Sequence, residues 1–470
     1  MQNSVKADFI PDLLIQGDIV LPDRVLTDCM IGIRDGLIAG IFEAGAIPSG
    51  CERIDARGKL VLPGVIDAHV HCFSSLQEGF VYATRSAAAG GVTTLIDMPY
   101  DAGAPVVSAD VLFKKRKRLE NEAVVDVALL GTIKKTGGLD QISKLAEAGV
   151  CGFKVSLFET DPERFPRIPD GELLDAFRLI KETGLPIGVH AENDEIVKSE
   201  SSREHSLAST DPLSHSRSRP KVAESEAVLR ALELAYATGV RLHIYHVSHP
   251  RIFDLVDWYR EQGVMVSAET CVHYLTLNET DLLRLGAKAK VNPPLRTESD
   301  RKGLWQLCAA GRVDFITSDH APWELERKQK ENIFDNAAGM PGVEMLLPLI
   351  YSKGVAGGKI TINDLARLLS ENPARIFNLF PGKGQIRPGA DADLVILDPE
   401  VKWTVDETKQ HSTAGWSPYN GRAMQGKIVR TIVRGETVYD GTAIVVESGF
   451  GKFVEPDKNK QGKQISHVIY

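Results

Sequence analysis

The stretch at residues 62–71, LPGVIDAHVH, joins a short apolar run to a pair of histidines. Three later runs end in the same manner, at GFK (152–154), VHAE (189–192) and TSDHAP (317–322). Short apolar runs are typical of buried parallel strands, and polar metal-type ligands at the carboxyl ends of such strands form the catalytic sites of (β/α)8 barrels. The ordered set therefore predicts an α/β protein with a (β/α)8 TIM-like barrel and a two-metal hydrolase site at its mouth.

The middle of the chain alternates between candidate strands and candidate helices. Strands are expected at residues 64–71, 93–98, 123–131, 150–157, 186–192, 241–247, 264–269 and 313–319. Helices are expected between them, for example at residues 78–91, 138–149, 172–184 and 224–239. An open, doubly wound sheet is the alternative, but no glycine-rich phosphate-binding motif follows the first strand. The alternation therefore favours the closed barrel.

Both ends of the chain differ from the middle. Apolar and polar positions alternate between Gly/Asp turn signals at residues 12–22, 29–43 and 51–64, and again at 389–399, 402–406 and 426–441. This pattern is typical of antiparallel strands. We expect a small β-sandwich domain built from residues 1–57 and 388–470, and a metal-dependent barrel over residues 58–387.

The composition limits the possible partners. The chain has 470 residues and a formal net charge of −8, without the basic cluster that nucleic acid or an anionic membrane would require. The N-terminal residues MQNSVKADFIPDLL lack the apolar core of a signal peptide, and no apolar run is long enough to span a bilayer. These features predict a cytoplasmic protein.

Two polar segments interrupt the alternation. Residues 199–220, SESSREHSLASTDPLSHSRSRP, follow the fifth candidate strand, so a long loop without regular structure is expected there, on the catalytic face. The tail after Val454 is polar and rich in lysine. We expect it to be solvated or to lie at a subunit contact.

His69 and His71 are the first candidate metal ligands. Alternate residues of a strand face the same side, so both imidazoles and Asp67 should point into the mouth of the barrel. Imidazole nitrogens are natural ligands of zinc and similar divalent metals. A pair of hydrogen-bonded histidines at a strand end is the alternative interpretation of this motif alone.

Lys154 ends the apolar run VCGFKVSL. A bare ammonium is costly to bury, so a paired or snorkelling lysine is the simple interpretation. The functional alternative is an uncharged amine that takes up carbon dioxide to form a carbamate able to bridge two metals. The neighbouring histidine motifs favour the carbamate.

His190 and His246 end two further apolar runs and fit a second metal. His243 should face the opposite side of its strand and is interpreted as a packing residue. Asp319 closes the last candidate strand, where its carboxylate could touch a metal and accept a proton; an aspartate capping a helix is the alternative. We expect a water molecule that bridges the two metals to attack an amide carbon after it loses a proton to Asp319. Asp319 should then deliver this proton to the departing amide nitrogen.

At this point the chain resembles the cyclic amidohydrolases, the group of allantoinases, dihydroorotases and hydantoinases or dihydropyrimidinases. The similar pieces include HVH (69–71), AAAGGVTTLIDMP (87–99), GFK (152–154), HAE (190–192), YHVS (245–248), KVNPPLR (290–296), TSDHAP (317–322), GMPGVE (339–344) and KGQIRPGADADLVILDP (383–399). The resemblance implies that two divalent metals are held by His69, His71, a carboxylated Lys154, His190, His246 and Asp319. Zinc is the expected metal, with manganese, cobalt or iron as alternatives, and dimers or tetramers are expected.

The chain departs from the resemblance at positions that contact substrate. Dihydroorotases commonly carry HxHLR and MPN, whose arginine and asparagine hold a ring carboxylate; here Cys72-Phe73 and Pro99-Tyr100 stand at those places. Hydantoinases usually carry a tyrosine five residues after the lysine, where this chain has Glu159. The arginine of the NEPGR loop of allantoinases also has no counterpart. A cyclic ureide or amide is the expected substrate, with allantoin the leading candidate.

Three further residues are candidates for substrate contacts. By analogy with the relatives, Asn292 is expected to hydrogen-bond the substrate ring, although a turn asparagine before two prolines is the simple alternative. Gly339 and Gly342 could bring backbone groups near the ring, with an ordinary turn as the alternative. Two other classes remain open: a structural homologue without catalysis, and a single-metal aminohydrolase that deaminates purines or pyrimidines.

Overall fold

The computed structural model describes residues 11–43, 51–207 and 211–457. Within these ranges the larger domain is an eight-stranded parallel sheet in the order β12-β11-β10-β9-β8-β7-β6-β5. Its strands are β5 (Val65–Val70), β6 (Val92–Asp97), β7 (Asp126–Gly131), β8 (Gly152–Ser156), β9 (Ile187–His190), β10 (Leu242–Ile244), β11 (Val266–Cys271) and β12 (Phe315–Thr317). Each falls within or next to a stretch expected from the sequence.

The sheet closes into a barrel between its first and last strands. Val70 forms a parallel bridge with His320, and the N–H of His71 donates to the carbonyl of His320 over 2.8 Å. A closed barrel leaves no strand edge to pair with another chain. The predicted (β/α)8 fold is confirmed, and the open doubly wound sheet is excluded.

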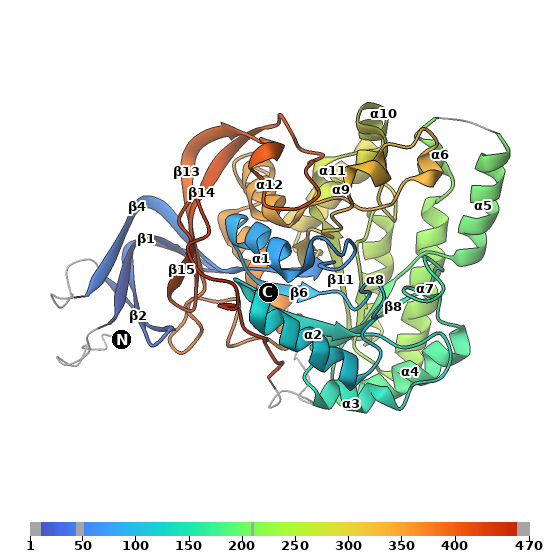
Figure 1. The fold of residues 1–470 in the computed structure, drawn as a ribbon, viewed down its shortest axis with the longest axis horizontal. Coiled ribbons are helices and arrows are strands. Elements are labelled where there is room, and N and C mark those ends of the chain that lie inside the picture. Colours follow the sequence, from blue (N-terminus) through green and yellow to red (C-terminus); the bar gives the residue numbers. More distant parts are fainter. Residues whose placement is uncertain (1–10, 44–50, 208–210, 458–470) are drawn as a thin grey trace.

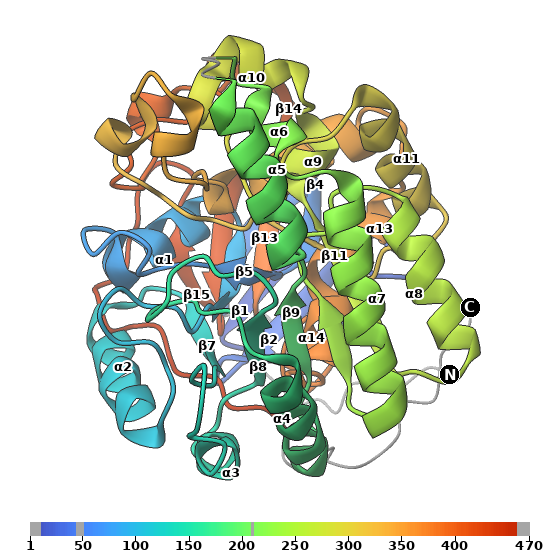
Figure 2. The ribbon, with the colours of Figure 1, turned by 90° about the vertical axis from the view of Figure 1, so that its right-hand side faces the viewer.

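Helices surround the barrel strands (Figures 1 and 2). They are α1 (Gly79–Ala89), α2 (Ala109–Glu122), α3 (Gln141–Glu147), α4 (Asp170–Thr183), α7 (Lys221–Thr238), α8 (Arg251–Glu261) and α11 (Glu298–Ala309), with the shorter α9 (Val272–Thr276), α10 (Thr280–Leu285), α12 (Leu346–Leu349), α13 (Ile362–Ala366) and α14 (Asn372–Ile376). In α4, Leu173, Phe177 and Ile180 recur at helical spacing and are buried. This helix ends at Gly184, whose φ of 70° is the left-handed conformation that glycine adopts at little cost.

The expectation of an irregular loop over residues 199–220 is wrong. The segment belongs largely to α5 (Asp194–Ser206) and α6 (Ser214–Arg217), while residues 208–210 lie outside the described residues. Asn193 caps α5, since its side chain accepts the N–H of Ile196. The helix buries little apolar surface and is held instead by polar contacts, such as the pair between Arg217 and Glu204 at 3.0 Å. Apolar periodicity therefore could not reveal it.

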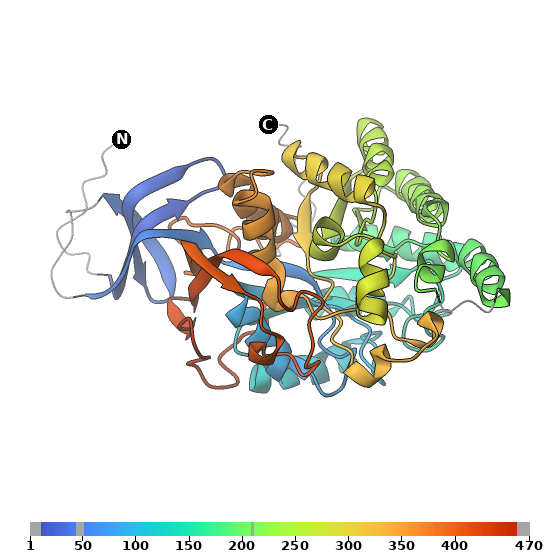
Figure 3. The same ribbon diagram turned by 90° about the horizontal axis from the view of Figure 1, so that it is seen from above.

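The smaller domain is a mixed sheet from both ends of the chain (Figures 1 and 3). In the described ranges it has seven strands in the order β15-β14-β13-β4-β1-β2-β3. They are β1 (Leu13–Val20), β2 (Val25–Arg34), β3 (Leu37–Glu43), β4 (Glu52–Pro63), β13 (Leu394–Thr404), β14 (Ala423–Val433) and β15 (Glu436–Tyr439). Antiparallel pairing of β4 with β13 joins the two ends, and Ile15, Ile31 and Ile396 share one core.

The expectation of a separate β domain is thus confirmed, whereas its boundaries at residues 57/58 and 387/388 stay predictions. The chain after β15 returns to the barrel, where Val454 donates to the carbonyl of Val127 over 2.9 Å. The end of the predicted solvated tail, residues 458–470, lies outside the described residues. Over the part of the chain that is described, no helix has both the length and the apolar character needed to cross a membrane.

A buried charge cluster ties the two domains together. The ammonium of Lys383 lies 2.5 Å from Asp126 at the start of β7, and 2.8 Å from both Asp391 and Asp393 just before β13. Arg434 pairs with Asp126 from the far end of β14. These carboxylates could otherwise form a metal-type cluster, but the lysine already lies among them.

Replacing Lys383 by methionine is expected to lower the free energy of unfolding by about 3–5 kcal/mol, because buried carboxylates lose their central partner. The thermal unfolding midpoint of the whole chain measures the effect. Lys402→Met, at an exposed lysine of β13, is the matched control and should change stability by no more than about 0.5 kcal/mol. Equal midpoints for the two variants would contradict a stabilising role for the cluster.

Candidate active site

A cavity of about 460 Å³ lies at the carboxyl ends of the barrel strands. All six candidate metal ligands line it: His69 and His71 from the end of β5, Lys154 from β8, His190 from β9, His246 after β10 and Asp319 after β12. Carboxyl ends of parallel barrel strands meet at one face, which explains why residues so far apart in the sequence converge.

His69, His71 and Asp319 form the first group of possible ligands. Their ligand atoms lie within 4.8 Å of one another, and Asp319 Oδ1 is 3.1 Å from His69 Nε2 and 3.4 Å from His71 Nε2. Burial lowers the pKa of His71 to about 4 and that of His69 well below 6.5. Both imidazoles are therefore uncharged near neutral pH and have a lone pair to offer.

Glu269 orients the ring of His69. Its Oε1 lies 2.6 Å from His69 Nδ1 and also receives the N–H of His246 and the hydroxyl of Thr317. Metal-binding histidines usually donate their other ring N–H to a carboxylate, so Nδ1 of His69 is the expected donor when Nε2 binds a metal. The lone pair of Nε2 is then directed at Asp319 and Lys154.

His190 and His246 form the second group. His190 Nδ1 lies 2.8 Å from His246 Nε2, and His190 Nε2 lies 2.9 Å from the carboxylate of Glu192. Glu192 is held in turn by Arg219 at 2.5 Å, and this cation helps to lower the pKa of Glu192 to about 2 despite its burial. The ionised carboxylate keeps the proton on Nε2 of His190, which leaves Nδ1 as a ligand atom.

Lys154 lies beside His69 of the first group and lines the same cavity as the second. Its Nζ is 2.8 Å from His69 Nε2 and 3.2 Å from the sulfur of Met98, and the side chain is 1% exposed. Among the described residues no carboxylate lies within 4.0 Å of Nζ, so Lys154 is neither paired nor snorkelling. Burial lowers its pKa to about 8, which increases the fraction of uncharged amine.

Two of these residues have unusual backbone conformations. His246 has a φ of 40° and Asp319 a φ of 48°, in the left-handed region that residues other than glycine seldom adopt. Such conformations cost about 1–3 kcal/mol each and persist where the surrounding structure enforces them. In this barrel they turn the two side chains from their strand ends toward the cavity.

The donor set fits divalent metals. Four imidazoles and one carboxylate are typical ligands of zinc and its neighbours, whereas an ammonium at Lys154 would repel a cation. The site therefore fits two metals best when Lys154 is uncharged or anionic.

Two of the three residues predicted to contact substrate line the cavity, and the third does not. Asn292 and Gly339 line the cavity, and Asn292 Oδ1 is buried with no hydrogen-bond partner among the described residues, so it is free to meet a ligand. Gly342 does not line the cavity. Its N–H donates instead to His320 Nδ1 over 3.1 Å. Glu159 lines the cavity, but its carboxylate contacts Lys135 at 2.6 Å.

His243 and His320 do not line the cavity. His243 contacts Ser267 and Glu269 and stacks on Phe315 with ring centroids 5.0 Å apart, in agreement with its interpretation as a packing residue. His320 connects Gly342 with Glu78 rather than facing a metal.

Sequence reasoning missed Glu192 and Glu269 as partners of the ligands. Both carry a charge inside or next to a buried strand run, in HAE and in AETC. A carboxylate buried there needs a polar partner, so the position of each glutamate in an apolar run could have indicated such a contact. The sequence alone could not identify His69 as the partner of Glu269, because the two residues are 200 positions apart.

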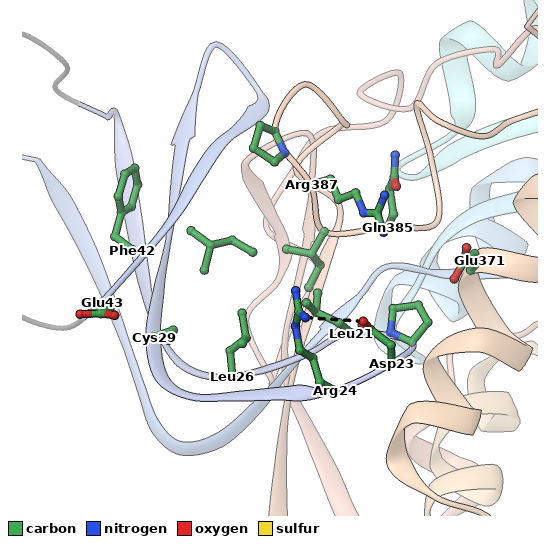
Figure 4. Close-up of a pocket in the computed structure, with 14 residues that line it drawn as sticks. Leu21, Asp23, Arg24, Leu26, Cys29, Phe42, Glu43, Glu371, Gln385 and Arg387 are labelled. Atoms are coloured by element: carbon green, nitrogen blue, oxygen red, sulfur yellow. Dashed lines mark ion pairs between the residues drawn. The ribbon is translucent and has the colours of Figure 1, made fainter. Parts of the chain in front are cut away.

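A second cavity of about 450 Å³ lies between the small domain and the barrel (Figure 4). Figure 4 shows Leu26 and Phe42 on one side of it and Gln385 and Arg387 on the other, with Arg24 and Asp23 3.8 Å apart. None of the candidate ligands lines this cavity. The chemistry-bearing side chains are thus concentrated at the barrel mouth.

Comparison with known proteins agrees with this geometry. The Amidohydrolase family matches residues 60–438. The chain is 40% identical to an allantoinase of Rubrobacter xylanophilus over 96% of this chain and 98% of that one, and 33% identical to the L-hydantoinase of Paenarthrobacter aurescens over 94% and 98%. The solved structure of an L-hydantoinase (dihydropyrimidinase) from Arthrobacter aurescens superposes with a TM-score of 0.92 at 33% identity, over 95% of this chain and all of that one. With its barrel, its second sheet and its cavity, the chain belongs to the amidohydrolase family.

Proposed function

We propose that this protein is a metal-dependent hydrolase that opens the amide bond of a cyclic ureide, with allantoin as the leading substrate. One observation carries the proposal: six side chains from five barrel strands converge on a single cavity, with Lys154 in contact with His69 and with His190 in contact with His246. Similarity to an allantoinase and to an L-hydantoinase supports the class of substrate.

Two divalent cations, with zinc the first candidate, would be held by these residues. His69, His71 and Asp319 would hold one, and His190 and His246 the other. The uncharged amine of Lys154 would add to carbon dioxide and release a proton, which would leave a carbamate anion as a further ligand for the cations. When bound, the metals supply a Lewis acid for the ring carbonyl and lower the pKa of a water molecule.

Asp319 is the proposed proton carrier. Burial alone would raise the pKa of Asp319, but the hydrogen bond with His71 helps to lower it, so the side chain is a carboxylate able to accept a proton. Its Oδ1 faces the two histidines, which leaves Oδ2 to take a proton from the attacking water and to deliver it to the departing ring nitrogen.

Other cavity residues would position the ring and exclude water. Tyr100 and Phe165 stack with centroids 3.7 Å apart and form an apolar wall, and Asn292 offers its free Oδ1 to a ring N–H. A contact through the backbone of Gly339 belongs to the same proposal. We further propose a dimer or tetramer, for which light scattering of the purified protein is the test.

Glu269→Gln is expected to weaken metal binding about 10- to 100-fold, because the neutral amide no longer holds the Nδ1–H of His69 as a carboxylate does. Metal content after dialysis against graded chelator concentrations measures the change. Glu331→Gln removes an exposed carboxylate that makes no hydrogen bond or ion pair with a described residue and serves as the control. Unchanged metal affinity in a folded Glu269→Gln variant would show that the residue has only a packing role.

A panel of rings tests the proposed function as a whole. Metal-replete protein is assayed with allantoin, dihydroorotate, hydantoin and dihydrouracil by the change in absorbance on ring opening. Turnover of allantoin is the expected result. If only hydantoin or dihydrouracil opened, the reaction type would stand and the substrate would be corrected. Failure to bind metal or to open any ring would support a non-catalytic homologue.

A further inference from the structure

Arg164 reaches the loop that follows the HVH motif. It lies between β8 and α4, yet its Nη2 donates to the carbonyl of Phe73 over 3.4 Å and to the hydroxyl of Ser74 over 3.3 Å. The sequence has no arginine of its own at that place after β5. The tertiary structure thus brings a cation to this loop from a segment 91 residues away.

The orientation of this guanidinium is fixed by the protein. Its Nε donates to the carbonyl of Tyr100 over 2.5 Å, and Arg164 lines the cavity. Nη1 has no hydrogen bond to a described residue, so its two N–H groups remain for a ligand. Preorganised donors of this kind bind without a further loss of side-chain freedom.

No carboxylate neutralises Arg164. None belonging to a described residue lies within 4.0 Å of its guanidinium. Asp161 accepts the backbone N–H of Arg164 over 2.8 Å, and Asp101 is paired with Lys115 at 2.6 Å. Within the described part of the chain, Arg164 therefore has no directly paired carboxylate, although Asp101 and Asp161 act on it from a longer distance.

A second arginine lies beside the first. The guanidinium of Arg327 is 4.0 Å from the ring centroid of Trp323, and that of Arg164 is 5.7 Å from the same ring. The side chain of Arg327 makes no ion pair or hydrogen bond with the described part of the chain, and it also lines the cavity. Two neighbouring cations repel each other, so an electron-rich ligand between them would be stabilised.

The other cations of the cavity are already occupied. Arg219 is paired with Glu192 at 2.5 Å. Lys290 donates to the backbone carbonyls of Ile333, Phe334 and Asn336 at 2.6–3.2 Å. Arg164 and Arg327 are thus the arginines of the described cavity wall that have no carboxylate within 4.0 Å.

We infer that Arg164, assisted by Arg327, binds a planar oxygen-bearing group on the substituent of the substrate ring and so determines which rings are accepted. The inference rests on the proposed function, since it concerns the same cavity. A guanidinium presents parallel N–H groups that match a carboxylate or a ureido carbonyl, whereas an alkyl substituent offers no acceptor. The candidate metal ligands of the same cavity would hold the ring amide.

Binding measured by calorimetry tests this without requiring turnover. The ligands are hydantoin-5-acetic acid, allantoin, an isobutyl-substituted hydantoin of similar size and unsubstituted hydantoin, each with the metal-replete protein. Arg164→Leu is expected to weaken binding of the first two about 10- to 100-fold, while the Kd for the isobutyl-substituted and unsubstituted rings changes less than about threefold. The stronger ligand of the first two identifies the group as carboxylate or ureido carbonyl.

Two further variants keep the test sharp. Arg327→Leu removes a side chain without hydrogen bonds, so it should fold normally and show the same selectivity loss to a smaller degree. Arg167→Leu changes an arginine of the same segment that does not line the cavity, and is the matched control. Equal weakening of all four ligands, or no change in any of them, would overturn the inference. Selective loss of affinity with no ring opened would instead reject the proposed function alone.

Discussion

Replacing Lys154 by alanine is expected to reduce ring opening by about 10³-fold or more. The variant loses the proposed carbamate ligand, and two-metal sites contribute several kcal/mol of transition-state stabilisation. Metal content should fall with activity. Rate measurements on allantoin, or on whichever ring the wild-type protein opens, with parallel metal analysis give the result.

Added short carboxylic acids such as acetate or propionate should restore part of the lost activity of Lys154→Ala, because a free carboxylate can enter the space that the side chain leaves. The same acids should not stimulate the wild-type protein or an Asp319→Asn variant. Lys114→Ala, at an exposed lysine of α2, is the control and should behave as the wild type. Full activity and metal content in Lys154→Ala would refute the shared carbamate.

Asp319→Asn is expected to lower kcat by about 10²- to 10⁴-fold, the range attributed to a positioned proton acceptor. An amide has nearly the same shape as the carboxylate but cannot accept the proton. The KM should change much less than kcat, because Asn292 and the aromatic wall still contact the ring. Steady-state kinetics with metal-saturated protein separates the two parameters.

Asp110→Asn, at an exposed position in the first turn of α2, is the matched control for this substitution. If metal content of Asp319→Asn fell in proportion to kcat, the side chain would act mainly as a ligand. If kcat stayed within about threefold of the wild type, another group would have to carry the proton, and the proposed role of Asp319 would be withdrawn.

The same cavity links catalysis to selectivity. Lys154, the histidines and Asp319 occupy its floor, where the resemblance to cyclic amidohydrolases places the reaction. The guanidiniums of Arg164 and Arg327 belong to its wall, where this chain departs from the dihydroorotase and allantoinase patterns. Differences in substituent preference among relatives of similar fold can therefore arise without any change in the ligands.

Much of the fold and of the ligand set followed from local sequence. The apolar runs before His69, Lys154 and Asp319 are long enough to form buried strands, and a strand that enters a parallel barrel must end at its common carboxyl face. The position of these residues at the mouth was therefore determined by each run separately. The β strands at both ends of the chain could also be predicted, since the alternation of apolar and polar residues between turns is a local property of the sequence.

Only the tertiary structure decided which side chains act on one another. Glu269 contacts His69 across 200 residues of chain, and Arg164 contacts Ser74 across 90. The helix at residues 194–206 is stabilised by polar contacts and caps, so its sequence lacks the apolar period that would have revealed it. An apolar run that forms a barrel strand determines the position of its last residue along the barrel axis. The pairing of loops and the orientation of charged groups depend on the closed barrel, because hydrogen bonds and ion pairs form between neighbours in space that no local pattern encodes.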